Sequence, residues 1–208
     1  MTRLTDCRKF LCAAAGVSVG INGPAFAANE GINIIGPKPG YSPQVGTLVS
    51  MLTWMSTMAI GGAVKGLTQA QLDYLFDSHA NTIGALLLHL AAVETYHQLN
   101  TFAGMKWDSR PAAVKQKWDP AMGLGQPGRD TIKGHDLDYY LKILDETREK
   151  SLAEFRKRDD AWLMSVDKEW GWNNYCKWFH VCEHISHHAG QIAFLTSRLP
   201  GAKPATGE

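Results

Sequence analysis

Histidine is concentrated in one short stretch near the C-terminal end of the chain. Four of the eight histidines, His180, His184, His187 and His188, lie within nine residues, in a segment whose apolar residues recur with the period of an α-helix. A neutral imidazole is the commonest metal ligand in proteins, and two imidazoles four residues apart on a helix can bind one ion. This stretch therefore predicts metal chemistry.

The direction of each side chain decides which of these histidines could share an ion. At about 100° per residue, the apolar stripe of this helix is formed by Val181, Ile185, Ile192, Leu195 and Leu199. His188 falls inside the stripe and His184 at its edge, whereas His180 and His187 point toward the polar side. Because an unpaired buried imidazole nitrogen costs about 1 to 3 kcal/mol, His184 and His188 need partners. A shared metal ion is one solution, and hydrogen bonds to a backbone carbonyl or a carboxylate are the other.

A third inward histidine is predicted in the segment 81–97. Asn81 is a suitable helix cap, and the apolar residues that follow continue for several turns. His89 lies on the face formed by Leu86, Val93 and Tyr96, whereas Glu94 and His97 lie at its margin. One histidine from this helix and a pair from the last would form a three-nitrogen site with a coordination position open to water or substrate.

Three other motif interpretations are disfavoured. His180 to His184 matches the H-x-x-E-H signature of inverted zinc proteases, but the only acid downstream is Glu208. Glu94 to His97 matches the Glu-x-x-His element of di-iron bundles, which require it twice, and the chain has no second copy. A hemerythrin-like site would need further histidines and bridging carboxylates on other helices.

The elements that would carry these histidines are helical throughout. Long amphipathic helices are expected over about 42–60, 81–102, 136–158 and 173–199, with a short helix over 69–76 capped by Thr68. A connection of about 30 residues, 104–134, joins the second and third long helices, with one or two helical turns expected near 111–118. The predicted fold is an all-α four-helix bundle with a long crossover connection between helices 2 and 3. It occupies residues 42–200, preceded by a linker (28–41) and followed by a tail (201–208).

Residues 1–27 have the pattern of a secretory signal peptide. Three basic residues precede an apolar run over 10–21, and Ala25-Phe26-Ala27 is a small-x-small cleavage pattern. The segment also resembles a twin-arginine signal in which Cys7 replaces the first arginine. We therefore expect export to the periplasm or the extracellular space, and no later segment is expected to span a bilayer.

Charge and cysteine content exclude some functions. Without residues 1–27 the chain carries 18 Lys and Arg against 19 Asp and Glu, so neither nucleic acid nor a membrane surface is an expected partner. Cys176 and Cys182 fall on one predicted helix about 9 Å apart along its axis, too far for a disulfide.

With four predicted helices and three inward histidines, the chain resembles the DinB-like family of metal-binding four-helix bundles. The resemblance covers about 42–199 and is most specific in Leu87–Glu94 and in Glu183–Ile192, which contains an H-x-x-x-H pair followed by Gly-Gln. It implies that His89, His184 and His188 bind a divalent metal, typically zinc or nickel. It also implies a transferase or isomerase activity that depends on a cytoplasmic low-molecular-weight thiol.

The expected function is therefore an exported metal-dependent hydrolase or transferase acting on a small molecule. The alternative is a non-catalytic metal-binding or stress-related protein. Iron(II) would accept three imidazoles as zinc and nickel do. Glu94, His97, His180 and Glu183 lie near the ligands in sequence, yet none is assigned as a catalytic base. The substrate is not assigned, and a homodimer is left open.

Overall fold

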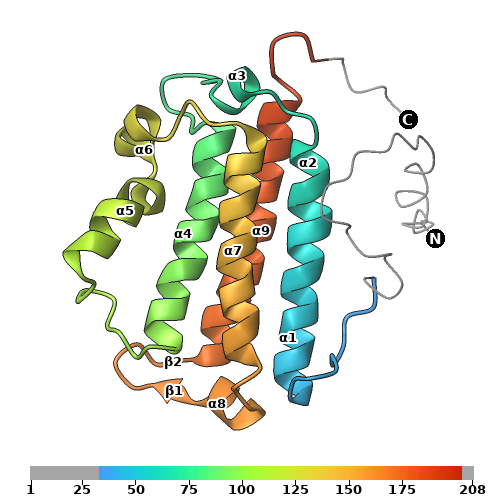
Figure 1. The fold of residues 1–208 in the computed structure, drawn as a ribbon, viewed down its shortest axis with the longest axis vertical. Coiled ribbons are helices and arrows are strands. Elements are labelled where there is room, and N and C mark those ends of the chain that lie inside the picture. The colour runs from blue at the N-terminus through green and yellow to red at the C-terminus, as the bar shows by residue number, and fades with distance from the viewer. Residues whose placement is uncertain (1–32, 203–208) are drawn as a thin grey trace, which may run out of the picture. The chain divides into compact units, whose positions relative to one another are not determined.

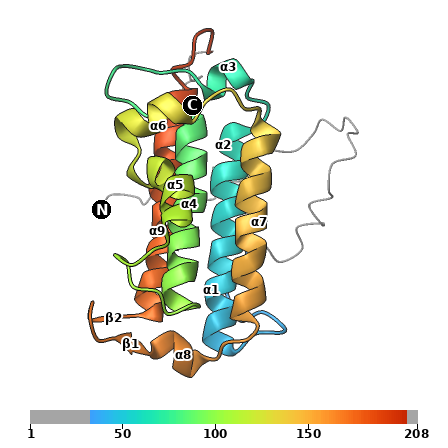
Figure 2. The same cartoon turned by 60° about the vertical axis from the view of Figure 1, so that its left-hand side comes forward.

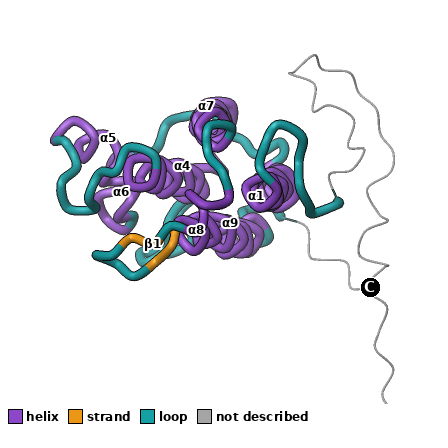
Figure 3. The backbone as a smooth tube through the Cα atoms, turned by 90° about the horizontal axis from the view of Figure 1, so that it is seen from below, coloured by secondary structure: helices purple, strands orange, loops and turns teal. Residues whose placement is uncertain are grey.

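Four long helical segments pack around one core in the computed structural model, which describes residues 33–202 (Figure 1). Their bounds are Pro43–Val64, Ile83–Thr101 (α4), Leu137–Phe155 (α7) and Asn174–Thr196 (α9). The first comprises α1 (Pro43–Trp54), a π-helical stretch (Met55–Gly61) and α2 (Gly62–Val64). Seen end on, these segments form the four corners of a bundle (Figure 3). The predicted all-α four-helix bundle is confirmed, and its first helix continues past the expected end near residue 60.

The second and third long helices run in the same direction. Gly84, at the start of α4, lies against Tyr140 at the start of α7, and Gln98 near the end of α4 bonds Ser151 near the end of α7. The chain must therefore return along the bundle between them, which confirms the predicted crossover. By contrast α9 runs antiparallel to α4, because Trp178 in its first turns donates to Thr101 at the end of α4.

The crossover is more helical than the sequence suggested. It contains α5 (Ala112–Gly123), which lies alongside α4, and α6 (Gly125–Thr131), which packs against α5 (Figures 1 and 2). Prolines and glycines in this region favoured a loop, but Trp118 and Ala121 are buried against the bundle and hold α5 in place. Leu124, whose φ is +53°, separates the two helices.

Helix α4 begins one residue later than predicted. Thr82, not Asn81, caps it, since its side chain accepts a hydrogen bond from the amide of Ala85. Asn81 instead accepts from the amide of Gly125 at 3.0 Å, which ties the crossover to the start of α4. The predicted starts of the last two long helices hold, with side chains of Asp136 and Asn173 as caps.

The cap of α1 comes from another part of the chain. Ser42 occupies the cap position, but its hydroxyl donates to Asp160 Oδ1 at 2.6 Å. The same oxygen accepts from the amides of Gln44 and Val45 at 2.9 and 3.2 Å. Asp160 begins the short helix α8 (Asp160–Met164), so α8 satisfies the free amides of α1.

Two smaller features differ from expectation. Helix α3 is only Gln69–Leu72, although Thr68 caps it as predicted and forms a reciprocal capping box with Gln71. A hairpin of β1 (Val166–Asp167) and β2 (Trp172–Asn173) precedes α9, with α8 beside it at the lower end in Figure 1. Strands of two residues are too short to leave an alternating pattern, so they could not be predicted from the sequence.

Helix α4 is buried around most of its circumference. Its apolar residues meet those of α1, α7 and α9 in the core, and α5 covers it from outside. Glu94 and His97, expected at the margin, are therefore buried at 4% exposure each. Gly84 permits the close approach of α7, because a Cβ there would lie 2.7 Å from the hydroxyl of Tyr140.

The helical run Pro43–Val64 is long and apolar enough to cross a bilayer by length and composition, contrary to the sequence-based expectation. In this fold it is a bundle helix, with Val45, Leu48 and Leu52 fully buried in the core. The predicted signal peptide, residues 1–27, lies outside the residues that the structure describes.

Candidate metal centre

The structure brings together the three histidines that the sequence singled out. His89 on α4 and His184 and His188 on α9 offer ligand atoms that all lie within 4.8 Å of one another. The Nε2 atom of His184 is 2.8 Å from that of His89 and 3.1 Å from that of His188. Three Nε2 atoms therefore converge on one point between the two helices.

In His89 and His188 the nitrogen that points away from the cluster, Nδ1, donates a hydrogen bond. Nδ1 of His89 lies 2.8 Å from the carbonyl oxygen of Ala121 on α5, which can only accept a hydrogen bond. Nδ1 of His188 lies 2.8 Å from Oε1 of Gln191, whose amide nitrogen faces His187. Since Nδ1 holds the proton in each neutral ring, the Nε2 atoms of His89 and His188 present lone pairs to the cluster.

These lone pairs cannot all be satisfied within the cluster. A proton on Nε2 of His184 could be donated to His89 or to His188, but one proton does not serve both. A divalent cation accepts all three nitrogens at once. Two imidazole nitrogens bound to one ion at about 2.0–2.1 Å lie roughly 3.0–3.4 Å apart, close to the observed separations. The donor set and its orientation therefore fit a metal ion.

The electrostatics of the site keep the imidazoles neutral. Burial, together with the neighbouring imidazoles, lowers the pKa of His89 to about 4 and that of His184 to about 3. Burial also lowers the pKa of His188. Near pH 7 all three rings are therefore neutral before any ion arrives, and a second proton does not compete with the ion for the lone pairs.

The nearby acidic residue on α4 has a different task. Glu94 points to α7, where its carboxylate accepts from Arg148 Nη2 at 2.8 Å and from the hydroxyl of Ser151 at 2.6 Å. With side-chain exposures of 5% and 13%, Glu94 and Arg148 form a buried ion pair in the bundle. Glu94 is thus committed to holding α4 and α7 together.

His180 and His97 extend the row of imidazoles from the cluster toward the hairpin end of α4 and α9. The ring of His180 lies 5.3 Å from that of His184 and 5.8 Å from that of His97, centroid to centroid. Nδ1 of His180 contacts the carboxylate of Glu183 at 3.0 Å. His97 is buried, and its Nδ1–H donates to the carbonyl of Val93. His187 is exposed and lies outside the cluster.

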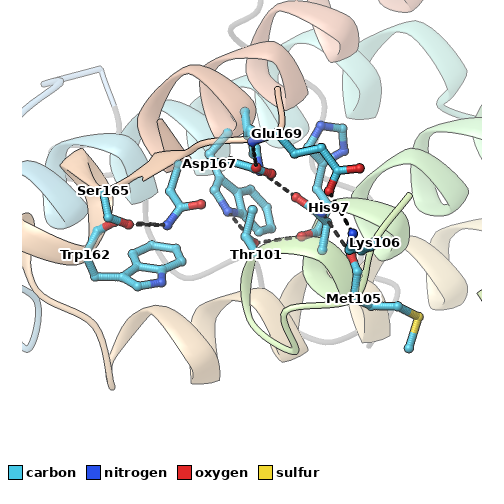
Figure 4. A network of polar contacts seen from close by, with 12 residues as sticks. His97, Thr101, Met105, Lys106, Trp162, Ser165, Asp167 and Glu169 are labelled. Atoms are coloured by element: carbon cyan, nitrogen blue, oxygen red, sulfur yellow. Dashed lines mark hydrogen bonds and ion pairs between the residues drawn. The ribbon is translucent and has the colours of Figure 1, made fainter. Parts of the chain in front are cut away.

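A polar network lies at the hairpin end of α4 and α9 (Figure 4). The buried ammonium of Lys177 donates to Asp167 on the hairpin and to Asn100 on α4, each at 2.7 Å. This salt bridge lowers the pKa of Asp167. In Figure 4 the side chain of Asp167 lies toward Thr101 and the end of α4. The network fixes the hairpin against α4, and it contains no part of the three-histidine cluster.

Sequence reasoning missed two groups that orient the cluster. The carbonyl of Ala121 belongs to the backbone, so no side chain signals its role. Gln191 appeared in the sequence only as part of the Gly-Gln motif. Its spacing of three residues from His188 was the available signal, because side chains three apart on a helix can contact each other.

A bundle of four helices with three converging histidines defines the DinB-like class of metal-binding proteins. The chain matches the model of the mycothiol-S-transferase family, a DinB-like family, over residues 47–201 and belongs to that family. None of the curated proteins compared with the chain matches it.

Proposed function

We propose that this protein is a metal-dependent S-transferase that joins a small thiol to an electrophilic carbon. One observation carries the proposal: the Nε2 atoms of His89, His184 and His188 converge, two of them as oriented lone pairs. Membership of the mycothiol-S-transferase family supports a thiol as one substrate.

The three imidazoles suit this chemistry because they are neutral. A divalent ion held by them would keep its full charge, and so would lower the pKa of a thiol or water bound beside it. The roles of the chain are to hold the ion by three nitrogens, to fix the ring orientations through Ala121 and Gln191, and to leave a coordination position for substrate.

The proposed reaction balances without an external oxidant or reductant. The thiol loses its proton to solvent, and the sulfur electron pair forms a bond to the electrophilic carbon. The bond from that carbon to its leaving group breaks, and the leaving group departs with the bonding pair. The products are a thioether, the leaving group as an anion and a proton in solvent, as in any substitution at carbon by a thiol.

Zinc and nickel are the proposed ions, and iron(II) also accepts three imidazoles. Elemental analysis of protein purified without added metal identifies the ion. We expect about one equivalent of one of these metals per chain, and a His184→Ala variant should contain almost none.

The reaction is tested with mycothiol, the thiol in the family name, and 1-chloro-2,4-dinitrobenzene as the electrophile. We expect thioether formation that requires both the thiol and the metal, and that is lost in His184→Ala. Chloride release at the same rate without thiol would indicate the hydrolase alternative. Metal binding with no turnover would indicate the non-catalytic alternative, and either outcome overturns the transferase.

Export is a separate proposal, which rests on residues 1–27 alone. Expression of the full chain in a bacterial host, followed by fractionation, tests it. We expect protein shortened by about this segment outside the cytoplasm. Full-length protein confined to the cytoplasm would contradict export, and would leave the proposed S-transferase reaction untouched.

A further inference from the structure

A hollow of about 540 Å³ opens beside the histidine cluster, between the start of α4 and the last turns of α9. Its volume falls within the range of about 300–1,000 Å³ that is typical of small-molecule sites. Leu86 lies about one helical turn before His89, and Gln191 about one turn after His188. The hollow therefore adjoins the cluster on both helices.

The residues that line this hollow favour an uncharged, apolar ligand. Leu86, Phe194 and Leu195 form its apolar part, and none of its lining residues is Asp, Glu, Lys or Arg. The hollow at the hairpin end, of about 300 Å³, is lined by Lys106, Asp167, Glu169 and Lys177. The polar side chains that line the first hollow are His79, Asn81, His187 and Gln191, and none of them carries a permanent charge. A charged group would lose hydration there with less compensation than in the second hollow, so the two hollows differ in the ligands they suit.

Gln191 connects the hollow to the cluster directly. Its side chain lines the hollow, and its Oε1 accepts the hydrogen bond from Nδ1 of His188. A molecule in the hollow would thus lie against the group that orients one of the three imidazoles. The three histidines do not themselves line the hollow, so a ligand there would adjoin the centre through Gln191.

Gly190 keeps the hollow open. It lies within α9, where glycine costs about 0.5–1 kcal/mol relative to alanine. The fold does not require it, since a Cβ at Gly190 would meet nothing within 4 Å. A side chain at this position would extend over the hollow that Gly190 lines. Glycine at this position therefore leaves the hollow open to a ligand.

Phe194 adds an aromatic surface at the rim. Its side chain is 47% exposed, its ring meets that of Phe76 edge to face at 5.8 Å, and the guanidinium of Arg198 lies over the ring at 3.7 Å from its centroid. The pair of Phe76 and Phe194 still offers a ring face and edges to a flat aromatic molecule.

We propose that this hollow binds the electrophilic substrate through an uncharged aromatic or alkyl group. The site itself stands on the hollow and Gly190, whereas its assignment to the electrophile rests on the proposed S-transferase function.

The uncharged fluorophore N-phenyl-1-naphthylamine tests the site without any need for turnover. We expect saturable fluorescence enhancement with the metal-loaded wild-type protein, and at least tenfold weaker binding to Gly190→Leu. Gly62→Leu is the matched control, because Gly62 is also a helical glycine whose Cβ would meet nothing within 4 Å. Its binding should equal that of wild type. Phe194→Ala should weaken binding without disturbing the core.

Equal binding by wild type and Gly190→Leu, or equal loss in Gly62→Leu, would overturn the site. Displacement of the fluorophore by 1-chloro-2,4-dinitrobenzene supports its assignment to the electrophile, and failure to displace it overturns that assignment. Gly190→Leu should still bind one zinc ion, so loss of zinc would show that the variant disturbs the centre and would also count against the proposal. Failure of the transferase assay alone would leave the fluorophore result intact.

Discussion

His188 and Gln191 are joined by a 2.8 Å hydrogen bond from the ring nitrogen Nδ1 to the amide oxygen Oε1. This bond decides which nitrogen of His188 faces the other two histidines. If the ring turned or changed tautomer, its lone pair would no longer face the proposed ion. The amide of Gln191 prevents this, and so belongs to the proposed centre as the rings do.

Replacement of Gln191 should weaken metal binding even though Gln191 is not a predicted ligand. In Gln191→Leu the acceptor for His188 Nδ1–H is lost, and we expect about 10- to 100-fold lower zinc affinity by isothermal titration calorimetry. Gln191→Glu keeps an acceptor at the same place and should bind zinc close to the wild-type affinity. Equal affinities for wild type and Gln191→Leu would refute the orienting role.

Loss of any one of the three histidines should have a larger effect. His89→Ala and His184→Ala each remove one of three ligands, and we expect zinc affinity to fall by more than about 100-fold. His187→Ala is the control, since His187 belongs to the same cluster in sequence but is exposed and outside the site. If His187→Ala lost zinc as His184→Ala does, the selection of ligands by direction would be wrong.

The buried ion pair between α4 and α7 predicts a non-additive effect on stability. Arg148→Met leaves the carboxylate of Glu94 buried without its cation, so we expect the free energy of unfolding to fall by about 3–5 kcal/mol. The double variant Glu94→Leu with Arg148→Met removes both charges and should recover much of that loss. Urea denaturation measures all of these proteins, and a double variant less stable than Arg148→Met would contradict the prediction.

His97 predicts a pH dependence that is separate from the metal. Burial lowers its pKa to about 4, against about 6.5 in an unfolded chain. Between these values the unfolded chain binds a proton that the folded chain does not, so stability is complete above pH 6.5 and falls toward pH 4. His97 alone should account for about 2–3 kcal/mol between pH 7 and 4.5.

Urea denaturation of the metal-free protein, with chelator present, measures this dependence. In His97→Leu the stability difference between pH 7 and 4.5 should shrink by that amount, and the lowered pKa values of His89 and His184 should maintain the remainder. An unchanged difference would show that His97 takes up its proton in the folded protein as well.

The contact of Asp160 with the start of α1 predicts an effect on stability. Its carboxylate accepts three hydrogen bonds at the start of α1, and these lower its pKa. Asp160→Ala should therefore lower the melting temperature, and Asp160→Asn, which keeps one acceptor oxygen, should lower it less. Asp138→Ala is a control, since Asp138 lies in the first turn of α7 and has no part in this contact. A melting temperature equal to that of wild type in Asp160→Ala would count against the cap.

Much of the fold and the core of the site could be predicted from the sequence, because helical periodicity states which way a side chain points. The directions of His89, His184 and His188 follow from the apolar residues around them, and the structure brings these three together. The same periodicity placed Glu94 and His97 at a margin, and there it was wrong. The sequence of one helix does not show which of its faces other helices, such as α5 or α7, will cover.

The remaining misses share a physical cause. Asp160 caps a helix more than a hundred residues earlier, and no local pattern announces a long-range cap. The helices of the crossover contain Pro120 and several glycines, so local propensity opposes them, and the burial of Trp118 and Ala121 prevails.

The carbonyl of Ala121 that orients His89 belongs to the crossover and not to the four long helices. A bundle from which α5 had detached would keep its three histidines, yet one ring would be free to rotate away from the others. Ion binding and the docking of α5 should therefore strengthen each other by the same factor, as linked equilibria must. Protease cleavage within 104–111 would then be slower when an ion is bound, and its rate would report on metal occupancy.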